Sequence, residues 1–161
     1  MPIATVFFWQ IALAVHVLFV MIAFGWLLLY PFMVIATEQI EPRFLPTLLR
    51  MRQFIGRTLV NPGMVVVVVA GVYLTAALHQ WQDFYVQWGI GAVIVIGGLE
   101  GAVVIRQAGK LAALAQRDID ASGDGAIAWS REYLAVRGRA DQLNALLAVI
   151  VVVTIFLMVV R

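Results

Sequence analysis

Four long apolar stretches dominate the pattern of this chain, and polar residues are concentrated in the segments between them. A helix that crosses the hydrocarbon layer of a membrane needs about 20 predominantly apolar residues. Four stretches reach this length, at about residues 6–30, 59–79, 84–105 and 143–160. The pattern therefore predicts an all-α integral membrane protein, a four-helix bundle that forms a single transmembrane domain over residues 1–161.

The segment between the first two spans is predicted to be largely helical. Pro31 permits a kinked helix that runs on to Ala36. Residues 47–58 alternate apolar and basic positions, which suits a helix that lies on the membrane surface or leads into the second span. Asn61-Pro62-Gly63 predicts a turn or kink where that span begins.

The segment before the fourth span predicts two amphipathic helices, at 107–117 and 126–142, separated by a break at 118–125. Asp118, Asp120 and Ser122 resemble the start of a calcium-binding loop. The twelfth position of that loop is Trp129, where calcium requires a bidentate glutamate. The pattern therefore favours a solvated turn between helices.

The composition agrees with a chain surrounded by lipid. Hydrophobic residues make up 63% and charged residues 12%, against about 25% charge in soluble domains. The absence of cysteine excludes disulfides and thiolate chemistry. Residues 1–6 carry no Lys or Arg, which favours a retained first helix over a signal peptide. The basic residues form no nucleic-acid-binding pattern.

Basic residues are distributed unequally among the three connections, which predicts an orientation. The first connection holds four, the third holds six and the second holds none. Cytoplasmic loops are enriched in Lys and Arg, so both basic connections are expected in the cytoplasm and both termini outside. We expect a multi-pass protein of the bacterial inner membrane. Arg50, Arg52 and Arg57 are expected to contact anionic lipid headgroups, or else only to set the topology.

His16 and Glu100 are the ionisable residues expected near the middle of the membrane. Counting from the outer boundary places them about 15 Å and 18 Å deep. An ionisable side chain is costly at such depth and is a candidate functional site. Both lie beside small residues, including the Gly97/Gly101 pair, so we hypothesise that they touch and share a proton or hold a ligand. The alternative is that His16 only hydrogen-bonds a neighbouring helix.

Haem is a candidate cofactor for a histidine inside the membrane. The same estimate of depth limits which residues could bind its iron. His79 is expected about 15 Å from His16 along the membrane normal, too far for two axial ligands of one iron. Single ligation of a haem iron by His16 remains open. His79 is expected to be an interfacial histidine, with a surface metal or quinone contact as the alternative.

Several short motifs carry a resemblance to known families: Ala14-Val15-His16-Val17-Leu18, Gly25-Trp26, Tyr30-Pro31, Asn61-Pro62-Gly63, Gly71-Val72-Tyr73-Leu74 and Met158-Val159-Val160-Arg161. They resemble an uncharacterised family of four-helix bacterial integral membrane proteins, distantly similar to the copper-resistance CopD domain and to HemJ-type protoporphyrinogen oxidase. The resemblance implies haem b bound through His16. The intramembrane lysine of the HemJ type has no counterpart, because Lys110 is the only lysine.

Two functions follow from these observations. The first is a haem- or tetrapyrrole-binding membrane protein in which His16 is the ligand and Glu100 a proton or propionate partner. The second is a non-catalytic accessory or scaffold subunit of a membrane complex, or a homo-oligomer, in which both residues lock helix packing. An absorption spectrum distinguishes the two.

Overall fold

Within residues 7–160, which a computed structural model describes, the chain forms four long helical rods. The rods are Phe8–Ile40, Pro42–Ala77, Phe84–Ser122 and Arg131–Val160, and each is long and apolar enough to cross a membrane. The predicted all-α class with four candidate spans is therefore confirmed. The start of the first predicted span at residue 6, and Arg161, lie outside the described residues.

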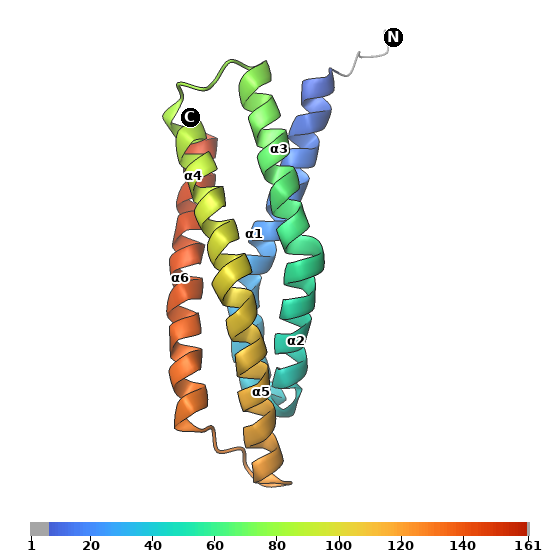
Figure 1. Ribbon diagram of the computed structural model, residues 1–161, viewed down its shortest axis with the longest axis vertical. Helices are drawn as coiled ribbons and strands as arrows, with labels where there is room; N and C mark the ends of the chain where they lie inside the picture. The colour runs from blue at the N-terminus through green and yellow to red at the C-terminus, as the bar shows by residue number, and fades with distance from the viewer. Residues whose placement is uncertain (1–6, 161) are drawn as a thin grey trace.

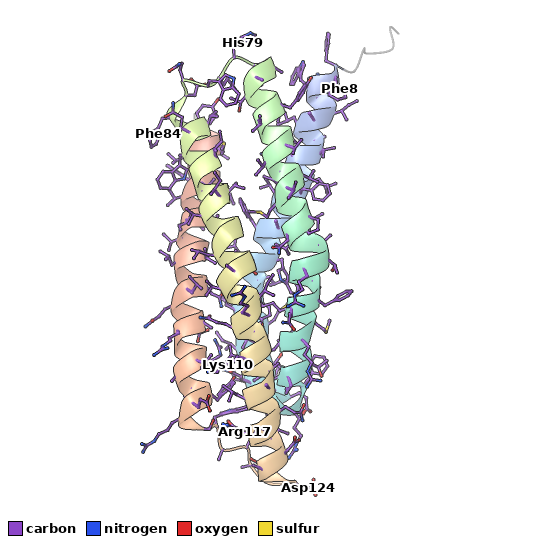
Figure 2. All side chains as sticks on the ribbon, in the orientation of Figure 1. Phe8, His79, Phe84, Lys110, Arg117 and Asp124 are labelled. Atoms are coloured by element: carbon purple, nitrogen blue, oxygen red, sulfur yellow. The ribbon has the colours of Figure 1, made fainter. Side chains whose placement is uncertain are left out.

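The rods run antiparallel and lie side by side (Figure 1). Phe8, Val160 and the connection 78–83 lie at one end of the bundle, which we call the terminal end. Residue 41 and the connection 123–130 lie at the other, which we call the basic end. Figure 2 shows Phe8, His79 and Phe84 at the terminal end, and Lys110, Arg117 and Asp124 toward the basic end. Arg43 ties the two basic-end connections together by donating to the backbone carbonyls of Gly123 and Gly125.

The first rod is a single helix, α1 (Phe8–Ile40), which continues through Pro31 as predicted. It has 33 residues and is therefore about 50 Å long. This exceeds a hydrocarbon layer of about 30 Å, so part of α1 must lie outside the layer or be strongly tilted.

The second rod joins a 3-10 turn, η1 (Pro42–Phe44), to α2 (Leu45–Ile55), a π-helical turn, η2 (Gly56–Val60), and α3 (Asn61–Ala77). Residues 47–58 thus lead into the second span. No break occurs at Asn61-Pro62-Gly63. Pro62 has no N–H to donate to the preceding turn, and the irregularity takes the form of the π turn directly before it.

The third rod consists of α4 (Phe84–Leu99), a second π turn, η3 (Glu100–Val104), and α5 (Ile105–Ser122). The predicted break at 118–125 begins too early, because Asp118 and Asp120 still lie in α5. Asp118 accepts hydrogen bonds from Arg117 and from the backbone N–H of Ser130. These contacts fasten the end of α5 to the chain before the next helix, and the resemblance to a calcium loop is not realised.

The fourth rod is α6 (Arg131–Val160), which begins five residues later than predicted. Ser130 explains its start, because its Oγ accepts the backbone N–H of Tyr133, three residues on. Residues 126–130 have no regular secondary structure, instead of being helical as predicted.

Packing divides the bundle into helix pairs and two apolar clusters. The closest neighbours are α1 with α3, α2 with α5, and α4 with α6. One cluster, toward the basic end, includes Leu45, Leu49 and Leu111. The other, nearer the middle, includes Leu27, Ile96 and Leu147. Trp26 packs against both clusters.

Candidate functional site

His16 fastens α1 to α3. Its Nδ1 lies 2.9 Å from the backbone carbonyl oxygen of Val67, and because a carbonyl only accepts, Nδ1 is the protonated nitrogen. One turn further along α3, Gly71 makes room for the ring, since a Cβ there would lie 3.1 Å from His16 Cε1. The expected alternative, in which His16 hydrogen-bonds a neighbouring helix, is therefore formed.

Glu100 forms a buried ion pair with Arg52. It is the first residue of the π turn η3, and both side chains are only 2% exposed. Arg52 Nη2 lies 3.2 Å from Glu100 Oε1 and 3.4 Å from Oε2. The pair joins the second rod to the third.

The hypothesised contact between His16 and Glu100 is not formed, because the two residues face different helices at different depths. His16 faces α3 at Val67, whereas Glu100 faces α2. Gly101, next to Glu100, lies beside Asn61, six residues before Val67 on the same helix. Six residues correspond to about 9 Å along the helix axis. Counting residues from an assumed membrane boundary missed this difference because it treats the helices as upright and evenly aligned.

Arg52 also contacts the two remaining rods. Its Nη2 lies 3.1 Å from Asn144 Oδ1 of α6, and its guanidinium carbon lies 3.9 Å above the ring of Tyr30 of α1. A cation over an aromatic face is stabilising, especially away from water. Each rod thus supplies one residue to a cluster that we call the polar junction: Tyr30, Arg52, Glu100 and Asn144.

The expectation that Arg52 contacts lipid headgroups is wrong. Arg50 and Arg57 are exposed, but Arg52 is buried. Two residues along a helix correspond to a rotation of about 200°, so Arg50 and Arg52 point to opposite sides of α2. The basic pattern of residues 47–58 therefore combines two outward arginines with one that faces the helix bundle.

A signal for the polar junction was present in the sequence. Arg52 continues the apolar stripe of Leu45, Leu48 and Leu49 at helical spacing, and all four are buried. Asn144 interrupts a similar buried stripe on α6 between Ala140 and Leu147. A polar residue inside a buried stripe must find a partner, because an unpaired polar group away from water is costly.

Three exposed arginines mark one border of the apolar part of the rods, and the position of the polar junction can be measured from that border. Arg57, Arg106 and Arg139 lie about 30, 33 and 32 Å from the terminal-end residues of their rods, Ala77, Phe84 and Val160. These lengths agree with one another and with a hydrocarbon layer of about 30 Å. We call the stretch between them the apolar band. Glu100 lies six residues inside its border, about 9 Å, and Arg52 reaches in from the basic side.

His79 lies apart from these residues. It is exposed in the connection 78–83, with a positive φ of 57°. Gly71, the neighbour of His16, lies six residues, about 9 Å, before the end of α3 at Ala77, and His79 lies beyond that end. Within residues 7–160, no group of three or more His, Cys, Asp or Glu side chains is arranged to hold a metal ion.

Comparison of the chain with models of known families, with curated proteins and with solved structures finds no match.

Proposed function

We propose that the protein is a non-catalytic scaffold or accessory subunit of a membrane complex in the bacterial inner membrane. One observation carries this proposal: both intramembrane ionisable residues form hydrogen bonds between helices. His16 bonds to the backbone of α3, and Glu100 bonds to Arg52, which also bonds to Asn144. These contacts fix how the four rods pack together.

A buried polar cluster suits a scaffold because it favours one helix arrangement over others. Burying an ion pair costs solvation free energy that the attraction between the charges only partly offsets. Its benefit is specificity, since every alternative alignment of the rods leaves a charge unpaired in an apolar surrounding. A subunit with one fixed shape is suited to bind a second copy or another membrane protein.

A second candidate function is the binding of haem b or a related tetrapyrrole through His16. Histidines that bind metals usually donate their other ring N–H to a carbonyl or carboxylate. The bond from Nδ1 to Val67 fits that arrangement and leaves Nε2 with its lone pair. Bound haem would supply an iron centre for electron transfer or for small-ligand binding.

Glu100 fits the haem proposal less well than His16. Its two carboxylate oxygens both accept from Arg52 in a buried cluster, so it is not free to act as a partner of a propionate or as a proton donor to a group near His16. A haem site in this protein would therefore depend on His16 alone.

The absorption spectrum of the purified full-length protein, as isolated and after addition of hemin, separates the two candidates. A scaffold is expected to be folded and colourless, with no Soret band beyond that of free hemin. A Soret band that disappears in His16→Ala but persists in His79→Ala would overturn the scaffold proposal and support haem binding. His79→Ala is the matched control because it removes the other histidine, which is exposed.

A further inference from the structure

A small cavity adjoins the polar junction on the side of the basic end. Its volume is about 20 Å³, and it lies between α1, α2, α5 and α6. Its polar lining residues are Tyr30, Arg52, Gln107, Arg137 and Asn144, and the rest of its wall is apolar. Space of this size exceeds the roughly 10–15 Å³ that a single water molecule needs.

Three buried polar atoms of the lining residues have no hydrogen-bond partner among residues 7–160: Tyr30 Oη, Arg52 Nε and Gln107 Oε1. Trp26 Nε1 shares this property, but Trp26 does not line the cavity. Leaving a buried donor or acceptor unpaired costs about 1–3 kcal/mol. Three such atoms at one cavity indicate a ligand that both donates and accepts hydrogen bonds.

Water fits this set of atoms better than an ion does. Arg52 Nε can only donate, Gln107 Oε1 can only accept, and Tyr30 Oη can do either, which matches one water molecule. No carboxylate lines the cavity to hold a cation. The two guanidinium groups that line it, those of Arg52 and Arg137, are already paired with carboxylates, so no free positive charge remains for an anion.

Polar contacts continue from the cavity toward the basic end. Arg137 donates to Glu38, with Nε 3.0 Å from Oε1, and also pairs with Asp141. Glu38 accepts from Tyr133 Oη at 2.7 Å. The side chains of Glu38 and Asp141 are 26% and 47% exposed, so this chain of contacts reaches the protein surface.

Beyond Glu100, toward the terminal end, the buried side chains are mostly apolar, and the hydroxyls of the buried Thr75 and Thr154 already donate to backbone carbonyls of their own helices. The buried neighbours there are Leu27, Met64, Ile96, Leu147 and Val151. These side chains offer no hydrogen-bond partner to water, and empty apolar space stays dry. The two sides of the polar junction therefore differ in their capacity to hold water.

We propose that the cavity binds a water molecule between Arg52 Nε, Gln107 Oε1 and Tyr30 Oη, and that water reaches the polar junction only from the basic end. Because Arg137 lines the same cavity, the water lies between the Arg52–Glu100 pair and the Glu38–Arg137 pair. The result is a one-sided hydrated path that ends at Glu100. This goes beyond the scaffold role, because it assigns the polar junction a ligand and a direction of access.

Hydroxyl-radical footprinting of the full-length protein in lipid nanodiscs tests this proposal. Radicals generated from bound water oxidise side chains next to it even when those side chains are buried. Leu49 and Leu111 line the cavity, whereas Leu27 lies in the apolar core beyond the polar junction, and all three are 3% exposed. We expect several-fold more oxidation at Leu49 and Leu111 than at Leu27. Equal protection of all three would overturn the proposal.

A pair of variants tests which atoms hold the water. Gln107→Met removes the acceptor with little change in volume and is expected to lower oxidation of Leu49 and Leu111 to the level of Leu27. Gln53→Met is the control, because Gln53 is also half-buried but faces Gly109 outside the cavity. Unchanged oxidation in a folded Gln107→Met protein would overturn the assignment. If that variant does not fold, an experimental wild-type structure decides, by density about 2.7–3.2 Å from Arg52 Nε.

Discussion

Arg52 is the residue on which the polar contacts among the four rods depend. Its guanidinium pairs with Glu100, donates to Asn144 and lies over the ring of Tyr30. Removing one partner of a buried ion pair leaves the other charge without compensation, which costs about 3–5 kcal/mol. Removing both charges avoids that cost, although the hydrogen bond to Asn144 is lost with Arg52.

We therefore expect Arg52→Met and Glu100→Leu each to lower the free energy of unfolding by about 3–5 kcal/mol. The double variant is expected to lose far less than the sum of the two, because it leaves neither charge unpaired. Reversible unfolding in detergent or bicelles, followed by circular dichroism, measures these values.

Arg57→Met is the matched control for this comparison. It makes the same chemical change on the same rod, five residues away, at an exposed arginine that forms no ion pair among the described residues. Its effect should stay within about 0.5 kcal/mol. Strict additivity of Arg52→Met and Glu100→Leu would contradict a direct interaction between the two charges.

At the scale of single residues, the sequence identified which groups are unusual but not what they contact. The cost of ionisable groups in lipid singled out His16 and Glu100, and both are engaged in interhelical contacts. Their partners depend on how each helix is rotated and tilted, which the linear spacing does not specify. Arg52 was missed because it stands between two outward arginines, although its place in a leucine stripe indicated burial.

Among the helical elements, the two π turns, η2 and η3, are the most important for the polar junction, because one of them contains Glu100. η2 and η3 lie against each other, and Glu100 is the first residue of η3. A π turn holds about one residue more than an α turn. It therefore accommodates one extra residue without rotating the buried face of the following helix relative to that of the preceding one. The second and third rods thus keep their buried stripes in line on both sides of these turns.

This interpretation predicts that the two kinds of turn respond differently to deletion. Deletion of Thr58, which is exposed within η2, should convert the π turn to a regular α turn and leave the protein folded. Deletion of Val69, which is exposed in the regular helix α3, should rotate the rest of that helix by about 100° and move its buried face into lipid. Folded yield by size-exclusion chromatography measures both effects.

Each deletion removes one exposed residue from the second rod, one in a π turn and the other in a regular α turn, so their ranking decides the outcome. We expect a monodisperse protein for the Thr58 deletion and aggregation or loss of expression for the Val69 deletion. If both deletions are equally damaging, η2 does not serve to hold an extra residue in line.

Helix type and number followed from the sequence, whereas helix ends and irregular turns did not. Apolar length alone specifies that a segment is helical in lipid, because every backbone group must bond internally. The ends of helices depend on single hydrogen bonds. The bond from the Tyr133 N–H to Ser130 Oγ, for example, sets the start of α6 at Arg131 instead of the predicted residue 126. The π turns depend on contacts between rods. Asn61-Pro62-Gly63 indicated that the helix is irregular there, but not that the irregularity is a π turn.

Taken as a whole, the molecule is asymmetric along its long axis. The terminal end carries the connection 78–83, which contains no Lys or Arg, together with Trp81 and Trp88. Toward the basic end, the exposed Arg57, Arg106 and Arg139 lie at the border of the apolar band, and further basic residues lie beyond them. This arrangement fits a bilayer with the basic end on the cytoplasmic side, where Lys and Arg accumulate.

That asymmetry predicts the topology, which reporter fusions measure. Alkaline phosphatase, active only outside the cytoplasm, is expected to be active when fused after Arg161 and inactive when fused after Asp124. A fluorescent protein that folds only in the cytoplasm should give the opposite result at the same two sites. Asp124 lies in the connection at the basic end, and the fourth rod separates it from the last residues. A cytoplasmic signal after Arg161 would reverse the orientation, and the hydrated path to Glu100 would then open to the outside.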